Sequence, residues 1–317
     1  MSAAPRYAYF GPTGTFTEDA LLKYLAATDP SAHADVASRA DYATVPTALD
    51  AVRRGDVEAA MVPFENSVEG SVAVTLDELA SGDPLVIVAE VVLPVAFGLV
   101  VRPGTKLEDI RTASGHPHAY PQFRHWFETN LPGVTWEPAS SNAQAARDVA
   151  EGRTDAAFGS PRAAEVYALE LLRRDIHDTE GAETRFVLVG RPTGLTSPRT
   201  GADKTSLVLY MGEDHPGALL EILTELAVRG VNLTRIESRP TGGGIGSYCF
   251  SIDAEGHVDD ERVGEALTGL HRVCKDVRFL GSYPRADGHA PLLRSGVSDP
   301  EFADAQAWLA RIRRGEA

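Results

Sequence analysis

The chain has 317 residues, of which 43% are hydrophobic and 24% are charged, and this length and composition predict a globular protein of about two domains. Its 45 acidic residues outnumber its 30 basic residues, and the net charge of -15 excludes the broad basic surface that binds nucleic acid or anionic membranes. Two cysteines are too few for a disulfide framework, and residues 1–6 lack the apolar core of a signal peptide, so we expect a cytoplasmic protein.

The first part of the chain alternates strand and helix patterns. Phe16, Ala20, Leu21 and Tyr24 recur at helical spacing after a loop at residues 11–15. The elements predicted around this helix are a strand at 7–10, a helix at 46–54, a strand at 58–63, a loop at 64–67 and a helix at 74–79. Such alternation predicts an α/β sheet with functional loops at its strand ends.

A second α/β segment is predicted to begin at Leu85. Glu90 and Pro94 interrupt its apolar start, residues 85–101, which therefore predicts two strands rather than a membrane span. The predicted elements are strands at 85–93 and 96–101, helices at 121–131 and 142–151, a strand at 156–158, a helix after Ser160 and a strand at 186–189. Two α/β lobes, each too small to stand alone, imply a ligand cleft between them.

Residues 191–203 are poor in large apolar side chains and rich in turn formers, which is typical of a linker. The elements predicted next are a strand at 206–211, a helix at 216–229, a strand at 232–238, a glycine turn at 242–246, a strand at 247–253, a helix at 259–273 and a strand at 277–283. This βαββαβ order predicts a ferredoxin-like domain. After an irregular stretch at 286–298, we expect a terminal helix that packs on the body or on a partner through Phe302, Ala305, Leu309 and Ile312.

One tripeptide, Thr184-Arg185-Phe186, combines a hydroxyl and a permanent cation at the head of an apolar strand. The Thr184 hydroxyl can hydrogen-bond a leaving oxygen, and the Arg185 guanidinium can hold an anion in a fixed geometry. Taken in isolation, the pattern is more typical of a strand start beside a solvated surface charge. The other polar motifs of the chain decide between these two interpretations.

Two further motifs stand where strands are predicted to end. Pro63-Phe64-Glu65-Asn66-Ser67 offers a carboxylate, an amide and a hydroxyl on consecutive residues, although an Asn/Ser turn before a helix explains it equally well. Thr13 and Gly14 precede a helix, where backbone N–H groups and the helix dipole favour an anion. Together these motifs predict a site for a small carboxylate.

In the second domain, the run from Asp214 to Leu220 combines a cap, a proline and a glycine at a helix start. Capping alone explains this pattern, but Gly217 also leaves the helix start open to a carboxylate. Glu237-Ser238-Arg239-Pro240 ends the strand that begins at Asn232. These polar groups predict the completion of an amino-acid site.

The motifs at Gly11–Thr17, Pro63–Ser67 and Thr184–Phe186 together resemble those of the prephenate dehydratases. Gly217–Leu220 and Glu237–Pro240 resemble the ligand motifs of the C-terminal ACT domain of that family, so the resemblance covers about residues 6–283. One departure is Ser114-Gly115-His116-Pro117, which carries Gly115 where the family has a serine directly before His-Pro. The helical glutamine of the family corresponds to Gln122, and whether Ser114 replaces the family serine stays open.

The resemblance implies decarboxylative dehydration of prephenate to phenylpyruvate, without cofactor or metal. It implies an α/β fold with a two-lobed, periplasmic-binding-protein-like catalytic domain (1–190), a linker (191–203), a ferredoxin-like ACT domain (204–285) and a tail (286–317). The catalytic residues that it implies are Thr184, Gln122 and Glu65, and the substrate-binding residues are Arg185, Phe186, Asn66, Ser67, Thr13 and Gly14. We expect Arg185 to bind the side-chain carboxylate, because pairing with the ring carboxylate would stabilise the ground state against loss of CO2. The alternative for Arg185 is that it braces the sheet.

On the same resemblance, phenylalanine lowers the activity of a homodimer or homotetramer by binding Gly217, Ala218, Leu219, Leu220, Asn232, Glu237, Ser238 and Arg239. The chain begins in the α/β region, so we expect no fused mutase domain. His116 and His118 are too close together and too isolated for a metal site. Two alternatives stay open, namely arogenate as the substrate and a non-catalytic metabolite sensor.

Overall fold

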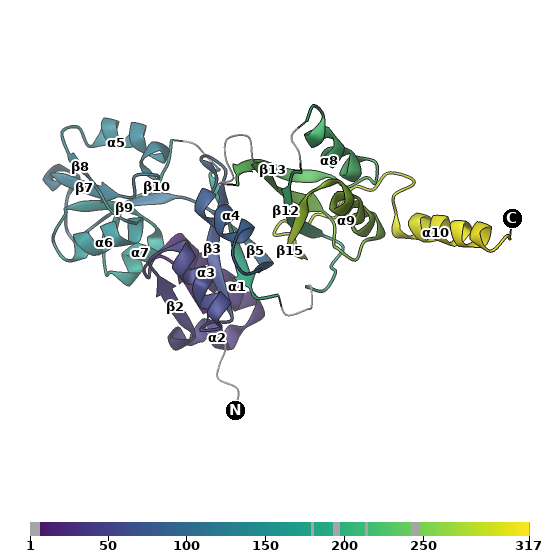
Figure 1. The fold of residues 1–317 in the computed structure, drawn as a ribbon. Coiled ribbons are helices and arrows are strands. Elements are labelled where there is room, and N and C mark those ends of the chain that lie inside the picture. The colour runs from purple at the N-terminus through teal and green to yellow at the C-terminus, as the bar shows by residue number, and fades with distance from the viewer. Residues whose placement is uncertain (1–6, 179–180, 193–196, 213–214, 242–247, 317) are drawn as a thin grey trace. The chain divides into compact units, whose positions relative to one another are not determined.

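The computed structural model describes residues 7–178, 181–192, 197–212, 215–241 and 248–316 of the chain (Figure 1). It divides into two compact units, one made of residues 1–75 and 91–189 and the other of residues 76–90 and 190–317. The predicted glycine turn at 242–246 and the cap at Asp214 lie outside the described residues.

The first lobe of the first unit is built on a sheet with the strand order β2-β1-β3-β11-β5 and a short β4 paired to β3. β1 pairs in parallel with both of its neighbours, as strand–helix alternation predicts. The strands are β1 (Tyr7–Phe10), β2 (Arg39–Tyr42), β3 (Ala59–Asn66), β4 (Gly70–Ser71), β5 (Val86–Pro94) and β11 (Glu183–Gly190). The helices are α1 (Phe16–Thr28), α2 (Pro30–Ala34), α3 (Val45–Arg54) and α4 (Ala73–Ala80). The division between the units falls inside α4 and β5, whose residues within 76–90 belong to the second unit.

Two predictions about this sheet are wrong. The loop predicted at 64–67 is strand as far as Asn66, because Glu65 and Asn66 pair with Ser71 and Gly70 of β4. The second α/β segment does not begin at Leu85, because β5 joins the first sheet and the chain enters the second sheet only after Pro94. The last strand, β11, returns to the first sheet and places Thr184 at its start.

The second lobe has a mixed five-stranded sheet with the order β10-β6-β9-β7-β8. Its strands are β6 (Phe97–Val101), β7 (Thr112–Gly115), β8 (Thr135–Pro138), β9 (Ala156–Gly159) and β10 (Glu170–Ile176). Its helices are α5 (Arg124–Asn130), α6 (Asn142–Ala150) and α7 (Pro161–Val166). The helix predicted from Pro121 starts instead as a 3-10 turn at Tyr120–Gln122.

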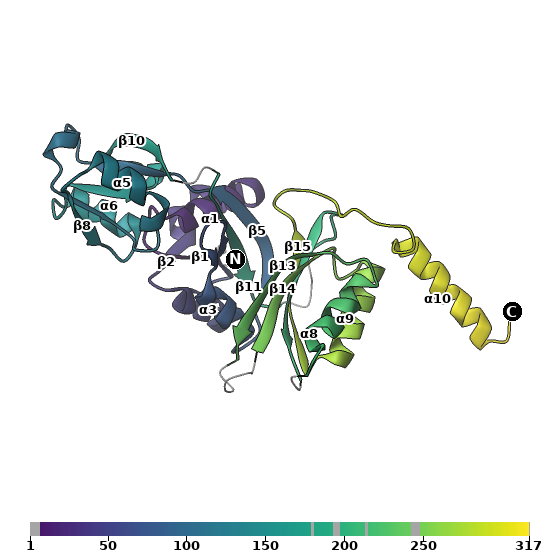
Figure 2. The ribbon, with the colours of Figure 1, turned by 90° about the horizontal axis from the view of Figure 1, so that it is seen from above.

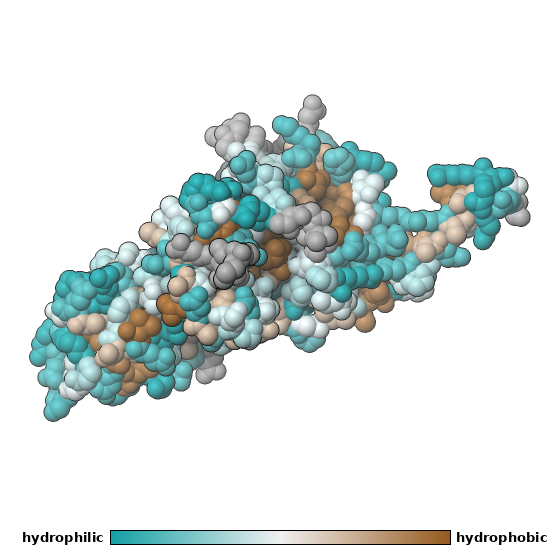
Figure 3. Space-filling model, turned by 90° about the horizontal axis from the view of Figure 1, so that it is seen from below, coloured by the Kyte–Doolittle hydropathy of each residue, from teal (hydrophilic) through white to brown (hydrophobic). Residues whose placement is uncertain are grey.

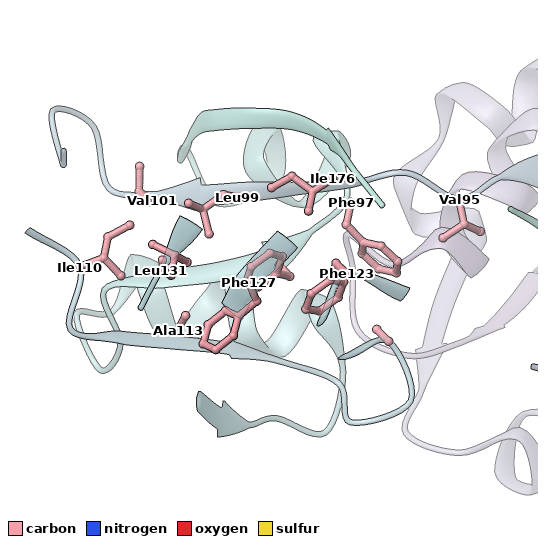
Figure 4. Close-up of a cluster of buried hydrophobic side chains, with 13 residues drawn as sticks. Val95, Phe97, Leu99, Val101, Ile110, Ala113, Phe123, Phe127, Leu131 and Ile176 are labelled. Carbon is pink, nitrogen blue, oxygen red and sulfur yellow. The ribbon is translucent and has the colours of Figure 1, made fainter. Parts of the chain in front are cut away.

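An apolar core anchors this 3-10 turn (Figure 4). Phe123, the residue after Gln122, is fully buried and stacks on Phe158 with 4.0 Å between ring centroids. An aromatic pair of this kind contributes ~1 kcal/mol beyond the burial of its surface. The core therefore fixes the backbone that carries the Gln122 side chain.

The second unit contains the predicted βαββαβ order, which confirms the ferredoxin-like prediction. Its antiparallel sheet has the order β13-β14-β12-β15, and α8 and α9 cover one face of it (Figure 2). The elements are β12 (Asp203–Tyr210), α8 (Ala218–Ala227), β13 (Leu233–Pro240), β14 (Tyr248–Glu255), α9 (Glu261–Val273) and β15 (Asp276–Pro284).

Charged groups are buried in this unit in pairs. The guanidinium of Arg235 lies 3.0 Å from the Asp253 carboxylate, and the Lys204 ammonium lies 2.8 Å from Glu90. Removing one partner of a buried pair costs several kcal/mol, because the other charge stays desolvated. Glu90 belongs to residues 76–90, so this segment of the N-terminal half is part of the second compact unit.

The predicted terminal helix is present as α10 (Asp299–Arg313), with a capping box formed by Ser298 and Glu301. The Asp299 carboxylate accepts a hydrogen bond from the Glu261 amide at the start of α9. No residue of α10 is buried, so packing of its apolar face on a partner stays a prediction.

Hydrophobic patches interrupt a largely hydrophilic surface on the face that Figure 3 shows. In the part of the chain that the structure describes, no helix combines the length and the apolar character that crossing a membrane requires. The α/β fold class is confirmed: the described elements form two sheets in the lobes of the first unit and a third sheet in the second unit.

Candidate active site

A cavity of about 240 Å³ lies between the two lobes of the first unit. The first lobe contributes side chains from the ends of β1, β3 and β11, and the second lobe contributes the 3-10 turn and the start of α6. The polar side chains that line it include those of Asn66, Glu69, His116, His118, Gln122, Asn142, Ser160 and Thr184. Side chains distant in sequence thus meet around a space large enough for a small molecule.

Thr184 and Phe186 line the cavity, whereas their neighbour Arg185 lies on the opposite face of β11. Successive side chains of a strand point to opposite faces, so the predicted hydroxyl and cation cannot share the cavity. The Arg185 guanidinium lies 4.5 Å from the Phe64 ring centroid and 3.5 Å from the Glu65 carboxylate. Glu65 and Arg185, predicted as catalytic and substrate-binding residues, instead form a pair that braces β3 against β11.

Asn66 fixes the Thr184 hydroxyl. Its Nδ2 donates a hydrogen bond of 2.8 Å to Thr184 Oγ1, and its Oδ1 accepts from the amides of Val68 (2.8 Å) and Glu69 (3.1 Å). These three bonds determine which end of the Asn66 amide faces Thr184. Because Thr184 Oγ1 accepts from Asn66, its own proton is directed toward a different acceptor.

Two other predicted residues, Ser67 and Thr13, make hydrogen bonds that support the site, and a third, Gly14, lines the cavity. The Ser67 hydroxyl accepts from the Glu183 amide at 2.9 Å and so holds the register of β11. The Thr13 carbonyl accepts from the Tyr167 hydroxyl at 3.0 Å, which links the two lobes. Gly14 lines the cavity, but its amide already donates to the buried Glu18 carboxylate at 2.8 Å, so it is not the free anion-binding group that was predicted.

The carboxylate that lines the cavity belongs to Glu69, which the sequence analysis missed. Gln122 Nε2 donates to Glu69 Oε1 at 3.2 Å, and His118 Nδ1 lies 3.6 Å from Glu69 Oε2. Glu69 comes from the β3–β4 turn of the first lobe, and both of its partners come from the second lobe. The position of the Glu69 carboxylate is therefore set by contacts between the two lobes. In the sequence, the one indication that Glu69 belongs to the site is that it closely follows the motif ending at Ser67.

His116 and His118 stack with 5.2 Å between their ring centroids. Burial, with a smaller contribution from the neighbouring His118, lowers the pKa of His116 and so favours its neutral imidazole. The His116 amide donates to Asn142 Oδ1 at 2.7 Å, which ties this segment to the start of α6. Across the described residues, no group of three or more His, Cys, Asp or Glu side chains has metal-binding geometry.

Gly115 packs directly against the ring of Trp136, which would have to move to make room for a larger residue. A Cβ atom at this position would lie 2.8 Å from Trp136, closer than real Cβ contacts come. The neighbouring Ser114 side chain is buried and is not among the residues that line the cavity within the described ranges. The glycine that replaces the family serine at position 115 therefore lies against the large indole ring of Trp136.

The described lining of the cavity offers backbone amides at two helix starts rather than cationic Lys or Arg side chains. No Lys or Arg is among the described lining residues. The starts of α1 and α6 border the cavity, with Thr15 accepting from the Glu18 amide and Ser141 from the Gln144 amide. Helix starts carry unpaired N–H groups and a partial positive charge that stabilise carboxylates.

The residues predicted to bind an amino acid lie on an exposed part of the second unit. Gly217 has a φ of 97° and caps α8, and the side chains of Asn232, Ser238, Leu219 and Leu220 are exposed. Arg239 donates two hydrogen bonds, of 3.0 and 2.7 Å, to the Asp77 carboxylate. Ala218 and Glu237 are half-buried beside them.

Comparison with known proteins identifies these two regions. Residues 7–194 match the sequence profile of prephenate dehydratase, and residues 205–272 match that of the ACT domain. The chain belongs to the prephenate dehydratase family. Enzymes of this family are carbon–oxygen lyases, and the cavity with Thr184 lies within the matched catalytic region.

Relatives match almost the whole chain. The prephenate dehydratase of Amycolatopsis methanolica is 48% identical, with 98% of this chain and 99% of the relative covered. The solved structure of a prephenate dehydratase from Arthrobacter aurescens in complex with L-Phe is 48% identical, covers 98% of this chain and 99% of its own, and superposes with a TM-score of 0.89. A structure described as GqqA, a novel type of quorum quenching acylase, is 31% identical over 88% of this chain and 97% of its own, with a TM-score of 0.75.

Proposed function

We propose that Thr184, Asn66 and Gln122 carry the decarboxylative dehydration of prephenate to phenylpyruvate in the cavity between the lobes. The reaction breaks the C–O bond to the ring hydroxyl and the C–C bond to the ring carboxylate. The electron pair of the C–C bond completes the aromatic ring, CO2 leaves, and the departing hydroxyl takes up one proton to leave as water. The protein has to orient the substrate and polarise the departing oxygen.

The observation that carries this proposal is the 2.8 Å hydrogen bond from Asn66 to Thr184 Oγ1. It leaves the Thr184 proton available for the departing oxygen, and it increases the acidity of that proton by withdrawing electron density from Oγ1. A threonine is too weak an acid to complete the transfer unaided, so Thr184 stabilises the departing hydroxyl as the C–O bond stretches.

The neutral donors of the cavity suit a carboxylate that has to leave as CO2. A guanidinium pairs strongly with a carboxylate and would stabilise the ground state more than the transition state. The helix starts at Phe16 and Asn142 hold negative charge less tightly than an ion pair does. They are therefore compatible with decarboxylation of a bound dianion.

For the second unit, we propose that L-phenylalanine binds at Gly217–Leu220, Asn232 and Glu237–Arg239 and lowers the activity. The relative from Arthrobacter aurescens was solved in complex with L-Phe, and this chain has the exposed ACT-domain motifs. Because these motifs are exposed in one chain, a second copy is needed to enclose the ligand, as a homodimer or homotetramer provides. We also propose a cytoplasmic location, and domain boundaries after residues 190, 203 and 285 that separate the catalytic domain, the linker, the ACT domain and the tail.

The experiment that tests the proposal measures phenylpyruvate formed from prephenate, and phenylalanine formed from arogenate, with and without L-phenylalanine. We expect turnover of prephenate that L-phenylalanine lowers. Faster turnover of arogenate would make this chain an arogenate dehydratase. Binding of prephenate without any product would favour the metabolite sensor and would overturn the catalytic proposal.

A further inference from the structure

Glu69 connects the two sides of the cavity. Its backbone amide donates to Asn66 Oδ1 at 3.1 Å, and its carboxylate accepts from Gln122 Nε2 at 3.2 Å. Asn66 in turn donates to Thr184 Oγ1 at 2.8 Å. A continuous series of hydrogen bonds therefore runs from Thr184 through Asn66 and Glu69 to Gln122.

The Gln122 side chain is 7% exposed, and its two amide ends have different surroundings. Nε2 has Glu69 as its acceptor, whereas Oε1 is buried and has no hydrogen-bond partner among the described residues. A buried acceptor without a partner costs ~1–3 kcal/mol. A flipped amide would be worse, because Oε1 would then face the negatively charged Glu69 carboxylate. The carboxylate thus fixes which end of the amide faces Glu69.

On the proposed function, the substrate supplies the partner that Oε1 lacks. Prephenate carries a ketone and two carboxylates, which only accept hydrogen bonds at neutral pH, and a single donor, its ring hydroxyl. A hydroxyl has one proton to donate and lone pairs to accept with. The ring hydroxyl can donate its proton to Gln122 Oε1 while its oxygen accepts a hydrogen bond from Thr184. These two hydrogen bonds together orient the C–O bond that breaks.

We propose that Glu69 is a positioning residue for this reaction: it holds the Gln122 amide with Oε1 toward the substrate hydroxyl and so aims the departing oxygen at Thr184. Glu69 itself neither contacts the reacting atoms nor transfers a proton. What the reaction needs from it is an acceptor for Gln122 Nε2. This role rests on the proposed function. It requires that any replacement at position 69 still accept a hydrogen bond from Gln122 Nε2.

The test compares Glu69→Gln with Glu69→Ala. A glutamine can still present an oxygen to Gln122 Nε2, so we expect Glu69→Gln to keep kcat within about 3-fold of the wild-type value. Alanine removes the acceptor, so we expect Glu69→Ala to lower kcat about 10- to 100-fold while KM changes much less. Glu137→Ala, at an exposed glutamate of β8, is the matched surface control and is expected to leave both constants unchanged.

A double-mutant cycle separates positioning from general support of the fold. In a Gln122→Ala background, the further change Glu69→Ala is expected to cost less than about 2-fold in kcat, because the residue that Glu69 positions is already gone. An undiminished loss in that background would overturn the proposal in favour of a merely structural role. A Glu69→Gln enzyme as impaired as Glu69→Ala would overturn it in favour of a charge or proton-donor role.

The two proposals fail in different ways. If wild-type enzyme forms no phenylpyruvate, the proposed function fails. If the wild type is active and Glu69→Ala has normal kcat, only the positioning role fails. Thermal unfolding of each variant, compared with the wild type, shows whether a loss of rate comes from a loss of folded protein.

Discussion

The catalytic cavity and the effector motifs differ in how much of each site a single chain provides. In the cavity, Thr184 and Gln122 are 8% and 7% exposed, and their hydrogen-bond partners are already in place. In the effector region, Leu220 is 67% exposed and Gly217 faces open space. The first site is preorganised by two lobes of one unit, whereas the residues predicted for the second lie on an exposed surface of the chain.

This difference has a physical consequence for the two sites. A preorganised site stabilises a transition state without reorganising at the moment of reaction, so single hydrogen bonds in it are worth a large factor in rate. A site formed by exposed motifs gains its binding energy only when a partner or ligand covers them. We therefore expect changes in the cavity to alter kcat strongly, and changes in the effector region to alter regulation modestly without altering kcat.

The largest effect is expected for Thr184→Val, which removes the hydroxyl and nearly preserves the shape. Loss of one donor to a developing charge lowers kcat by about 100- to 1,000-fold, whereas KM is expected to change only a few-fold. Steady-state kinetics of phenylpyruvate formation measures both constants. A normal kcat would show that the preorganised hydroxyl is not used.

Thr154→Val is the matched control for this change. Thr154 is buried in the same unit and outside the cavity lining, and within the described residues its Oγ1 has no hydrogen-bond partner. Replacing an unpaired buried hydroxyl by a methyl group leaves stability equal or higher. We expect wild-type kinetics, so a rate loss equal to that of Thr184→Val would mean that both changes act through the fold.

The effector side of the comparison is tested by Gly217→Ala. The residue has a φ of 97°, where a Cβ is strained, but no atom lies within 4 Å of the position that the Cβ would take. The change therefore costs ~1–2 kcal/mol of backbone strain without a steric clash. The free chain can relieve this strain by leaving the left-handed conformation, and ligand binding then has to restore it. We expect the L-phenylalanine concentration for half-inhibition to rise about 5- to 30-fold, with kcat unchanged in its absence.

Gly212→Ala provides the control for that experiment. Gly212 is exposed near the same helix start, its Cβ would also meet open space, and its φ lies outside the left-handed region. The inhibition curve is expected to stay unchanged. If Gly217→Ala also leaves inhibition unchanged, the left-handed geometry at position 217 is not needed for the effector site.

Much of the fold could be predicted because apolar periodicity marks buried elements. The strand at 7–10 and the βαββαβ order of the second unit follow their patterns closely. β2, β8 and β10 were missed because few of their side chains are buried, so they carry little apolar signal. β3 was ended too early because Glu65 and Asn66 look like turn residues, whereas their pairing with β4 keeps them in the sheet.

The cavity was predictable only in part. Thr184, Asn66 and Gln122 meet as the motifs predict, but Arg185 does not join them, because neighbouring residues of a strand face opposite ways. The alternation of side chains along a strand therefore favours the second interpretation of Arg185, in which it braces the sheet. Glu69 and Asn142 were not predictable in the same way, since their places depend on how two lobes meet, and no local pattern encodes that contact.

The smallest expected effect concerns Asp19, in the first turn of α1 beside the cavity. Burial, reinforced by the neighbouring Glu18 charge, raises the pKa of Asp19 to about 6, although Arg162 at 3.3 Å opposes this shift. The folded protein therefore binds the Asp19 proton more tightly than the unfolded chain does. The stability that this group contributes is present below pH 4 and is lost as the pH rises through about 6.

Asp19→Asn is thus expected to raise the free energy of unfolding of the catalytic unit at pH 8 by ~1 kcal/mol, because the lost contact with Arg162 offsets part of the gain. At pH 4 the gain should vanish, and urea unfolding at several pH values between these limits measures the difference. Asp29→Asn is the opposite control, since hydrogen bonds from Ser31 and Ala32 lower the pKa of the exposed Asp29 carboxyl. That variant should lose stability relative to the wild type at pH 8 rather than gain it. A gain for Asp19→Asn that is equal at both pH values would show that packing, not the buried charge beside the cavity, is responsible.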